Sequence, residues 1–369
     1  MTAPIVKGYC PGALQPMMSG DGLVVRIRPF NGTLSAAQIT GIADLSERFG
    51  NGILDLSSRA NVQLRGVTAE SHAPLIDGLH ALGLIDASEA IESRRNIIVT
   101  PFRNAETNAL AERLTTALCQ PDAPALPHKF GFAIDTGKTP VLQTAPADIR
   151  LERASDGTLL LAAEGLPQAK PVTPDESIEE ALALAHWFMA NRTTQTRLAK
   201  LPNLDSLIGF TTPRQTQTYA PQPGATQSGT LIGSAFGQLT AETFAQLATL
   251  APLHITPWRM VFTQSQNPIP GTLITDPANP LLRITACTGA PACTQAQGDT
   301  RQTARRVAPH LKPGQTLHIS GCTKGCAHPK PAPLTLIATP NGFDLVKDGR
   351  AGDTPAAQAL STNDILKAL

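Results

Sequence analysis

Residues 283–293 read RITACTGAPAC, a short strand pattern that ends at a cysteine and continues into a loop with glycine and proline. Residues 95–100 read RNIIVT and begin in the same way, but no cysteine follows. Each segment leads into a helical pattern, near 300–307 in one case and at about 105–119 in the other. The two segments therefore predict the same strand–helix unit at two places in the chain, as in an internal repeat.

The similarity extends on both sides of these segments. The strand pattern LVVRIR at 23–28 precedes a helical pattern from Ser35, a suitable N-cap, to Phe49. A second strand pattern at 231–236 precedes a helical pattern from 240 to 250, and Arg59 and Arg259 are expected to take matching places. Further downstream, two hairpins have Asp-Gly or Asn-Gly turns, at 156–157 and 341–342. We therefore expect two pseudo-equivalent α+β halves, although a common β-α-β order could also arise by coincidence.

The composition excludes several classes of protein. The chain has 369 residues, of which 16% are charged, and a net charge of +1, so no overall field would attract nucleic acid or anionic lipid. No apolar run approaches the roughly 20 residues of a membrane helix, and the first 22 residues have no signal-peptide pattern. We therefore expect a cytoplasmic protein with neither membrane nor nucleic acid as a partner.

Four of the six cysteines lie close together in the sequence. Cys287 and Cys293 form C-x5-C, and Cys322 and Cys326 form C-x3-C. Each pair follows a predicted strand, so adjacent parallel strands would bring all four thiolates to one edge of a sheet. Soft sulfur ligands favour a [4Fe–4S] cluster, and the glycines nearby would let backbone N–H groups approach it. Zinc or buried free thiols are the alternatives.

The remaining two cysteines are isolated in the sequence. Cys119 follows leucines at helical spacing, which predicts a core thiol. Cys10 precedes Pro-Gly in the N-terminal arm and is expected to be a free thiol. Neither belongs to the cysteine constellation.

Basic and amide residues recur at strand spacing in the first half. Alternate residues of a strand share a face, and Arg is suited to bidentate recognition of carboxylates. A solvated sheet face is the alternative, but two such runs together favour a carboxylate-binding surface. The residues that would form it are Arg26, Arg28, Arg59, Asn61, Gln63, Arg65, Arg95 and Lys129.

Motifs for other chemistries are missing. No G-x-G-x-x-G follows a predicted strand, so the sequence supports no Rossmann nicotinamide site. No H-E-x-x-H motif and no two-histidine-one-carboxylate pattern is visible, and the sequence identifies no catalytic acid or base. His328, two residues beyond Cys326, is structural or solvated in the simplest interpretation.

These motifs together resemble the sulfite and nitrite reductase superfamily, and within it the precorrin-3B synthases of aerobic cobalamin biosynthesis. The resemblance covers most of the chain. The segments that carry it are CPG at 10–12, GDGLVVRIR at 20–28, SRANVQLRG at 58–66, TPWR at 256–259, ACTGAPAC at 286–293, GCTKGCAHP at 321–329 and DLVKDGRAGD at 344–353.

The resemblance implies a fold and a division into domains. Each half would consist of a ferredoxin-like subdomain and a reductase-like α/β domain, related by a pseudo-twofold axis. The expected ranges are 1–92 and 93–202 for the first half, 203–228 for a linker, and 229–280 and 281–369 for the second half, whose last domain carries the cluster.

The resemblance also implies a site and a reaction. Cys287, Cys293, Cys322 and Cys326 would ligate a [4Fe–4S] cluster. By similarity to the reductases, the tetrapyrrole pocket would be lined by Arg26 or Arg28, Arg59, Arg95 and Lys129, and Arg259 is a further candidate for substrate binding. The reaction would be an O2-dependent hydroxylation of precorrin-3A at C20, with a γ-lactone formed on ring A. A mononuclear non-haem iron is also implied, with NADH as the ultimate donor through a separate reductase or ferredoxin.

Two departures separate the chain from the reductases of the superfamily. The second lysine that those enzymes place two residues after the matched lysine is Gly131 here, and the asparagine often found between the last two cysteines is replaced, with Lys324 in the loop. Both changes favour the synthase. A siroheme-dependent sulfite or nitrite reductase is the alternative.

Overall fold

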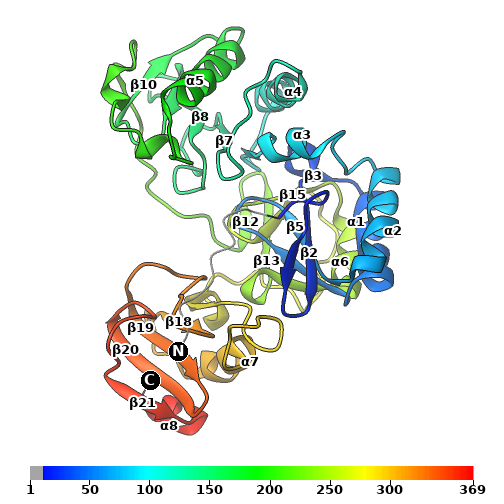
Figure 1. Ribbon diagram of the computed structural model, residues 1–369, viewed down its shortest axis with the longest axis vertical. Helices are drawn as coiled ribbons and strands as arrows, with labels where there is room; N and C mark the ends of the chain where they lie inside the picture. Colours follow the sequence, from blue (N-terminus) through cyan, green and yellow to red (C-terminus); the bar gives the residue numbers. More distant parts are fainter. Residues whose placement is uncertain (1–10, 369) are drawn as a thin grey trace.

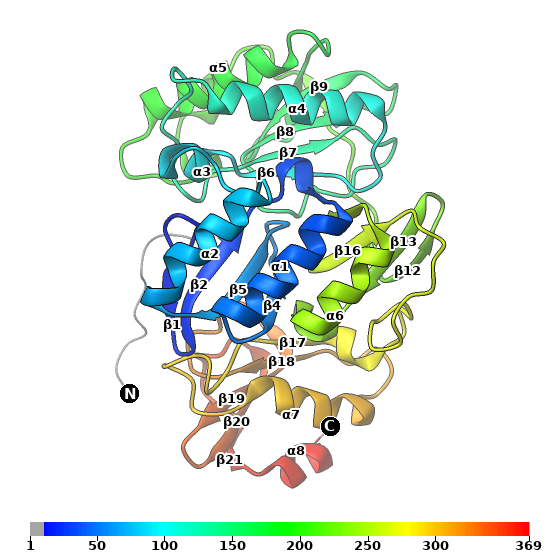
Figure 2. The same cartoon turned by 90° about the vertical axis from the view of Figure 1, so that its right-hand side faces the viewer.

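The computed structural model describes residues 11–368, so the predicted free thiol Cys10 lies outside the described residues. The chain forms four β-sheets arranged in three tiers (Figures 1 and 2). Two antiparallel sheets make the middle tier, and one mixed sheet lies above it and one below in these views. The α+β class and the two-half architecture predicted from the sequence are confirmed.

The two middle sheets have the same strand order. The first contains β1 (Met17–Ser19), β2 (Gly22–Ile27), β5 (Val62–Val67), β4 (Ile53–Leu56) and β14 (Gln238–Thr240). The second contains β12 (Gly224–Thr226), β13 (Gly229–Gly233), β16 (Met260–Thr263), β15 (Leu253–Ile255) and β3 (Thr33–Leu34). The fifth strand of each sheet is supplied by the other half of the chain, an exchange that the sequence patterns did not predict.

Three helices cover one face of the middle sheets. They are α1 (Ala36–Phe49), α2 (Ala69–Ala81) and α6 (Ala241–Gln246), which lie side by side in Figure 2. Ser35 caps α1 as expected: its side chain accepts the N–H of Gln38, whose side chain in turn accepts the N–H of Ser35. One apolar core lies beneath these helices and includes residues of both halves, such as Ile39 and Phe244. The opposite face of the middle sheets is left for the site.

The upper and lower tiers are related in the same way. Each begins with three parallel strands and continues into antiparallel ones. The upper sheet contains β6 (Ile97–Val99), β7 (Phe132–Asp135), β8 (Ile149–Arg153), β9 (Leu159–Ala163), β10 (Gln168–Pro171) and β11 (Thr212–Pro213), with α3 (Glu89–Arg94), α4 (Ala105–Cys119) and α5 (Ser177–Asn191). The lower sheet contains β17 (Ile284–Ala286), β18 (Leu317–Ser320), β19 (Ala332–Thr339), β20 (Gly342–Gly349) and β21 (Ala357–Leu360), with α7 (Thr300–Val307) and α8 (Thr362–Ala368).

Short 3-10 helices confirm the repeat in detail. Phe30–Gly32 and Ala235–Gly237 precede the exchanged strands, and their middle residues, Asn31 and Phe236, both adopt left-handed backbone angles with φ of 52° and 63°. The same uncommon backbone conformation at equivalent positions of the two halves is expected of a duplicated fold. The other 3-10 helices are Leu198–Lys200, Leu204–Ser206, Leu247–Leu250, Pro280–Arg283 and Ala308–His310.

The repeat corrects one expected correspondence. The turn after β4 is closed by the N–H of Ser57 on the carbonyl of Asn61, and the turn after β15 by the N–H of Thr256 on the carbonyl of Met260. Arg259 therefore matches Ala60, which shares its positive φ, and the residue that matches Arg59 is Trp258. The expected match of Arg59 with Arg259 was wrong by one residue, because the two turns have equal length but the arginine comes one residue later in the second turn.

Other expectations meet mixed outcomes. Cys119 lies at the end of α4 and is partly exposed, so it is no core thiol. The expected linker 203–228 contributes β11 and β12 to two sheets, and the domain boundaries stay predictions.

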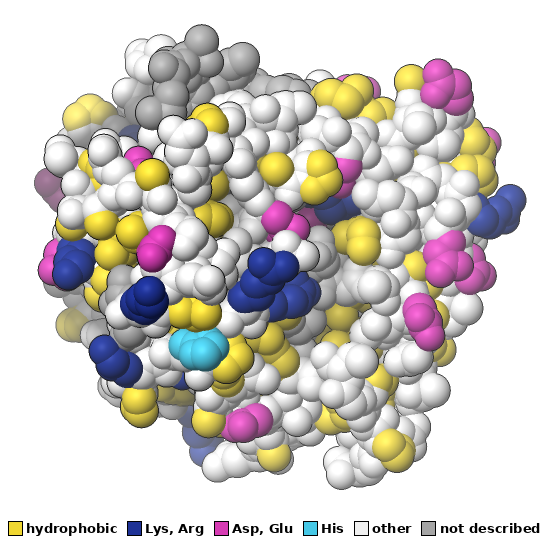
Figure 3. All heavy atoms as spheres, turned by 90° about the horizontal axis from the view of Figure 1, so that it is seen from below, with side chains coloured by type: hydrophobic (Ala, Val, Ile, Leu, Met, Phe, Trp, Pro, Cys, Tyr) yellow, Lys and Arg dark blue, Asp and Glu magenta, His cyan; other side chains and the backbone are white. Residues whose placement is uncertain are grey.

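Within residues 11–368, no helix is long and apolar enough to cross a membrane. The lower end of the molecule shows basic and acidic side chains interspersed (Figure 3), consistent with a net charge of +1.

Candidate functional site

The two cysteine loops leave the same edge of the lower sheet. Cys287 follows β17 directly, and Cys322 comes two residues after β18, which runs parallel to β17 with Ala286 opposite Ile319. The backbone N–H of Gly321 donates to Sγ of Cys287 at 3.1 Å, which joins one loop to the other. Parallel pairing therefore brings the C-x5-C and C-x3-C segments together.

The four thiols form one electrostatic group. Burial raises the pKa of Cys326, Lys324 opposes this, and charges on the other three cysteines raise the pKa further. In the described part of the chain, no three His, Cys, Asp or Glu side chains are placed to hold a single metal ion. A four-iron cluster has a different requirement, because each thiolate binds its own iron atom.

Two glycines allow the cysteine loops to pack closely against their neighbours. At Gly289, where φ is +72°, a Cβ would lie 2.6 Å from Oγ1 of Thr300, whose hydroxyl donates to the carbonyl of Cys287 at 2.7 Å. At Gly321, a Cβ would lie 2.6 Å from that of Ala296 and 3.5 Å from Sγ of Cys287. Both positions therefore need glycine, because a side chain at Gly289 would clash with Thr300 and one at Gly321 would clash with Ala296.

The first cysteine loop rests against the first middle sheet. The carbonyl of Ala292 accepts hydrogen bonds from the hydroxyl of Ser19 at 2.9 Å, the N–H of Gly20 at 3.1 Å and Nη2 of Arg65 at 3.3 Å. A strand edge of the first half thus holds a loop of the second. The cysteines lie beside the sheet face that α1 and α2 leave uncovered.

A polar row crosses that face. Arg26, Gln63, Asp55 and Gln238 are cross-strand partners on β2, β5, β4 and β14, and Arg26 donates to Oε1 of Gln63 at 2.7 and 3.1 Å. Because cross-strand partners point to the same side of a sheet, these four side chains share one face. The sequence spacing had predicted one shared face for Arg59, Asn61, Gln63 and Arg65. Gln63 and Arg65 do lie on β5, but Arg59 and Asn61 lie in the turn before it, because Ala60 has a left-handed backbone.

The second middle sheet has a different row at the equivalent places. Leu231, Phe262, His254 and Thr33 are its cross-strand partners. Phe262 lies in a T-shaped contact with Phe102, at 5.4 Å between ring centroids. The duplicated scaffold therefore carries a polar face in one half and an apolar, aromatic face in the other.

Arg65 is held by carboxylates. Its guanidinium donates to Asp21 at 2.7 and 2.8 Å and to Asp55 at 3.2 Å, and only 5% of the residue is exposed. Burial lowers its pKa, but the hydrogen bonds and charges of Asp21 and Asp55 outweigh that effect and leave the pKa above its ordinary value. Arg65 thus links the strands to the cysteine loop through Ala292.

Two further predicted residues form buried ion pairs. Arg95 donates to both carboxylate oxygens of Asp86 at 2.6 and 2.8 Å, and its guanidinium lies 3.9 Å from the ring centroid of Phe30. Arg28, one residue beyond β2, lies 3.3 Å from Glu92 of α3. These two arginines connect the first middle sheet to the upper tier.

The turn after β4 contacts the upper tier as well. Arg59 donates to the carbonyl of Pro146 at 3.3 Å and that of Lys129 at 3.1 Å, and the Lys129 side chain is exposed. A Cβ at Gly131 would lie 3.6 Å from Nη1 of Arg59, so Arg59 occupies the space beside this position. Asn61 is buried within the turn, where its N–H donates to Oγ of Ser57.

Arg259 lies where the two halves meet. It has a left-handed backbone with φ of 59°, and its Cβ would be 2.7 Å from a Cβ on Gly237. Burial lowers its pKa, the charge of Arg301 lowers it further, and Asp55 raises it. Its guanidinium is therefore near Asp55 and Arg301, on the polar side of the molecule.

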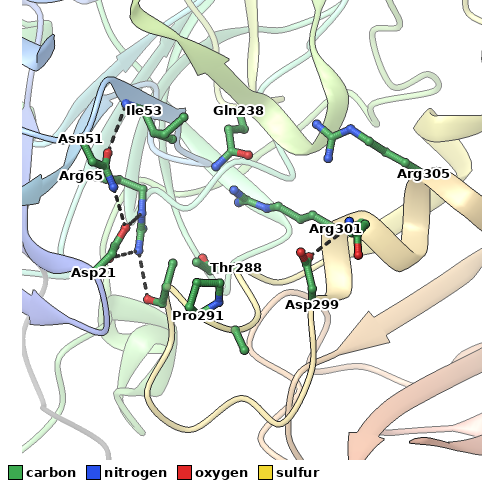
Figure 4. Close-up of a pocket in the computed structure, with 13 residues that line it drawn as sticks. Asp21, Asn51, Ile53, Arg65, Gln238, Thr288, Pro291, Asp299, Arg301 and Arg305 are labelled. Carbon is green, nitrogen blue, oxygen red and sulfur yellow. Dashed lines mark hydrogen bonds and ion pairs between the residues drawn. The ribbon is translucent and has the colours of Figure 1, made fainter.

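A pocket of about 450 Å³ opens between the first middle sheet, the first cysteine loop and α7. Figure 4 shows Arg301 reaching from α7 toward its centre, with Arg65 on the opposite side. The sequence interpretation missed Arg301, Arg305 and Gln238. Two arginines four residues apart, on the helix after the cysteine loop, were the signal that could have revealed Arg301 and Arg305.

Comparisons with known proteins identify the family to which this chain belongs. Residues 15–82 match the nitrite/sulfite reductase ferredoxin-like half domain. A precorrin-3B synthase from Sinorhizobium sp. is 31% identical, in an alignment that covers 96% of this chain and 86% of the relative. The chain belongs to the precorrin-3B synthase family of the nitrite and sulfite reductase superfamily.

Other similar proteins are nitrite reductases and related proteins with lower sequence identity. A ferredoxin–nitrite reductase from Synechococcus elongatus is 25% identical over 89% of this chain and 77% of its own. The structure of the Mycobacterium tuberculosis NirA protein matches with a TM-score of 0.59 and 18% identity, covering 88% of this chain and 74% of that one, and it supports the fold alone. The relatives identified by sequence are oxidoreductases, and the precorrin-3B synthase family places this chain in the same class.

Proposed function

We propose that the protein is a precorrin-3B synthase, an O2-dependent monooxygenase that hydroxylates precorrin-3A at C20 and closes a γ-lactone from the ring A acetate. The observation that carries this proposal is 31% identity to a precorrin-3B synthase along 96% of the chain. In the balanced reaction, one oxygen atom of O2 enters the product and the other leaves as water. NADH, acting through a separate reductase or a ferredoxin, would supply the two electrons.

The four cysteines are the proposed ligands of a [4Fe–4S] cluster. The shared loop edge, the N–H to sulfur hydrogen bond and the close-fitting glycines support this assignment. Such a cluster would supply electrons one at a time. The mononuclear iron implied by the resemblance has no ligand set of three among the described residues, and no step through it is part of the proposal.

The polar face is the proposed substrate surface. We propose that Arg26 with Gln63, Arg59 and the exposed Lys129 contribute to this surface, because precorrin-3A is rich in carboxylates and arginine and lysine bind carboxylates. Arg28, Arg65 and Arg95 would act on the substrate indirectly, by fixing the sheet against its neighbours. Asn61 would hold the turn that presents Arg59.

The decisive experiment uses anaerobically prepared protein, precorrin-3A, a chemical reductant and 18O2. We expect a product heavier by one oxygen atom, labelled from O2. Intact cluster with no labelled product would contradict the proposal. The second candidate, a siroheme-dependent nitrite or sulfite reductase, is favoured by the similarity to nitrite reductases over 89% of the chain, and a Soret band in the purified protein would support it.

A further inference from the structure

The pocket between the first middle sheet and α7 contains arginines that no part of the proposed site uses. Arg301 and Arg305 are four residues apart on α7 and therefore project from one side of the helix. Both line the pocket, together with Arg65 and Gln238 of the first middle sheet (Figure 4). Its walls thus come from both halves of the chain.

Arg301 is buried without a full set of partners. Only 8% of the residue is exposed, and its Nη1 donates to Oδ1 of Asp55 at 3.1 Å. Its Nε has no hydrogen-bond partner among the described residues. A buried guanidinium N–H without an acceptor is costly, so its position facing a pocket points to an acceptor from outside the chain.

The charges around the pocket leave positive charge in excess. Asp21 is paired with Arg65, and Asp55 accepts from both Arg65 and Arg301 while it also faces Arg259. Asp299 caps α7 by accepting the N–H of Gln302. Four guanidiniums, including Arg305, therefore face three carboxylates.

Arg305 provides a binding group at the entrance. It is exposed, and its guanidinium lies 5.2 Å from the ring centroid of Phe236. No carboxylate is paired with it among the described ion pairs. A stacked guanidinium keeps its N–H groups free to donate in the ring plane, which suits a carboxylate.

We infer that this pocket is a carboxylate subsite that takes one acidic side chain of the tetrapyrrole through Arg301 and Arg305. The inference rests on the proposed function, because the polar row from Arg26 to Gln238 leads along the sheet to the pocket and would lie beneath the macrocycle. A carboxylate there would supply the acceptor that Nε of Arg301 lacks. It would also join α7, which follows the cysteine loop, to the substrate.

Uroporphyrin III, a tetrapyrrole with acetate and propionate side chains, is the probe for this subsite. Its affinity for the cluster-containing protein is measured by fluorescence titration in the wild type, Arg305→Gln and Arg305→Glu. We expect Arg305→Gln to weaken binding about tenfold, and Arg305→Glu more, because a charge-assisted contact is lost and then reversed. Arg306→Gln and Arg306→Glu are the matched controls, since Arg306 is exposed on the same helix but does not line the pocket.

The possible results distinguish a failure of the subsite from a failure of the proposed function. If the wild type binds uroporphyrin and the Arg305 and Arg306 variants behave alike, the subsite is overturned and the proposed function stands. If the wild type does not bind uroporphyrin, the proposed function fails and the subsite with it. Succinate is the second probe: if Arg305→Gln weakens binding of succinate but not of uroporphyrin, the pocket takes a separate small acid, which also overturns the inference.

Discussion

Asp55 and His254 occupy equivalent positions in the two middle sheets, opposite Gln238 and Thr33 of the exchanged strands. Asp55 is an anion that holds Arg65 and Arg301. His254 is partly buried, with Nδ1 3.0 Å from Oγ1 of Thr33, and burial followed by the charge of Arg103 lowers its pKa to about 4. The first middle sheet therefore has a charged carboxylate at this position, whereas the second middle sheet has a neutral imidazole ring.

The low pKa of His254 predicts acid sensitivity. In the unfolded chain the imidazole takes up a proton near pH 6.5, whereas in the fold it stays neutral down to about 4, so stability present above pH 6.5 is lost as the pH falls toward 4. Between pH 7 and 5 this group should cost about 2 kcal/mol. Urea unfolding at both pH values should show a smaller loss in His254→Gln than in the wild type. An equal loss in both would contradict the assignment.

At the residue scale, the spacing of polar residues in the sequence predicted part of the polar face. Alternation placed Gln63 and Arg65 on one face, because side-chain direction in a strand follows from position alone, but the pairing of Arg26 with Gln63 came only from the structure. Alternation could not show that Arg65 and Arg95 are paired with Asp21 and Asp86, which lie elsewhere in the sequence. Charge at a position is visible in the sequence, but its neutralisation depends on contacts between distant residues.

At the scale of elements, the strand-to-loop junctions position the chemistry. β17 and β18 are parallel neighbours, so the loops that begin at Cys287 and Gly321 start side by side. In the first half, the junctions after β6 and β7 carry Thr100 and Thr136 instead. The same backbone therefore provides one junction pair with sulfur ligands and one without.

Replacing Cys322 by serine tests this junction. Because Cys322 is one of four proposed cluster ligands, we expect Cys322→Ser to lose most of its iron and acid-labile sulfide. Cys119→Ser is the control, since that partly exposed thiol lies at the end of α4, away from the two loops, and should retain the cluster. Iron and sulfide analysis with a visible spectrum provides the measurement. Equal cluster content in the two variants would exclude Cys322 as a ligand.

At the scale of the whole molecule, strand exchange ties the halves together. β14, from the second half, completes the first middle sheet on β4, and β3, from the first half, completes the second on β15. The apolar core under α1 contains residues of both halves, among them Leu54 and Leu239. Neither middle sheet is complete within its own half of the sequence.

This exchange predicts a stability effect that crosses between halves. Leu239 on β14 is 4% exposed, and Leu239→Ala should cost about 2–5 kcal/mol by leaving a cavity. We expect faster amide exchange in β4, which belongs to the other half but pairs with β14. Hydrogen–deuterium exchange with mass spectrometry measures it, and β9 in the upper tier provides an internal reference. Faster exchange confined to the second half would rule out this coupling.

The sequence alone determined the duplicated order of elements, the helix starting after Ser35 and the placement of four cysteines after two strands, because these depend on periodicity and local spacing. Only the tertiary structure decided that the halves exchange strands, that Trp258 rather than Arg259 matches Arg59, and that Arg301 and Arg305 face a pocket lined by Arg65. Those features join residues more than a hundred positions apart, and their geometry is fixed by packing between tiers, which local patterns do not encode.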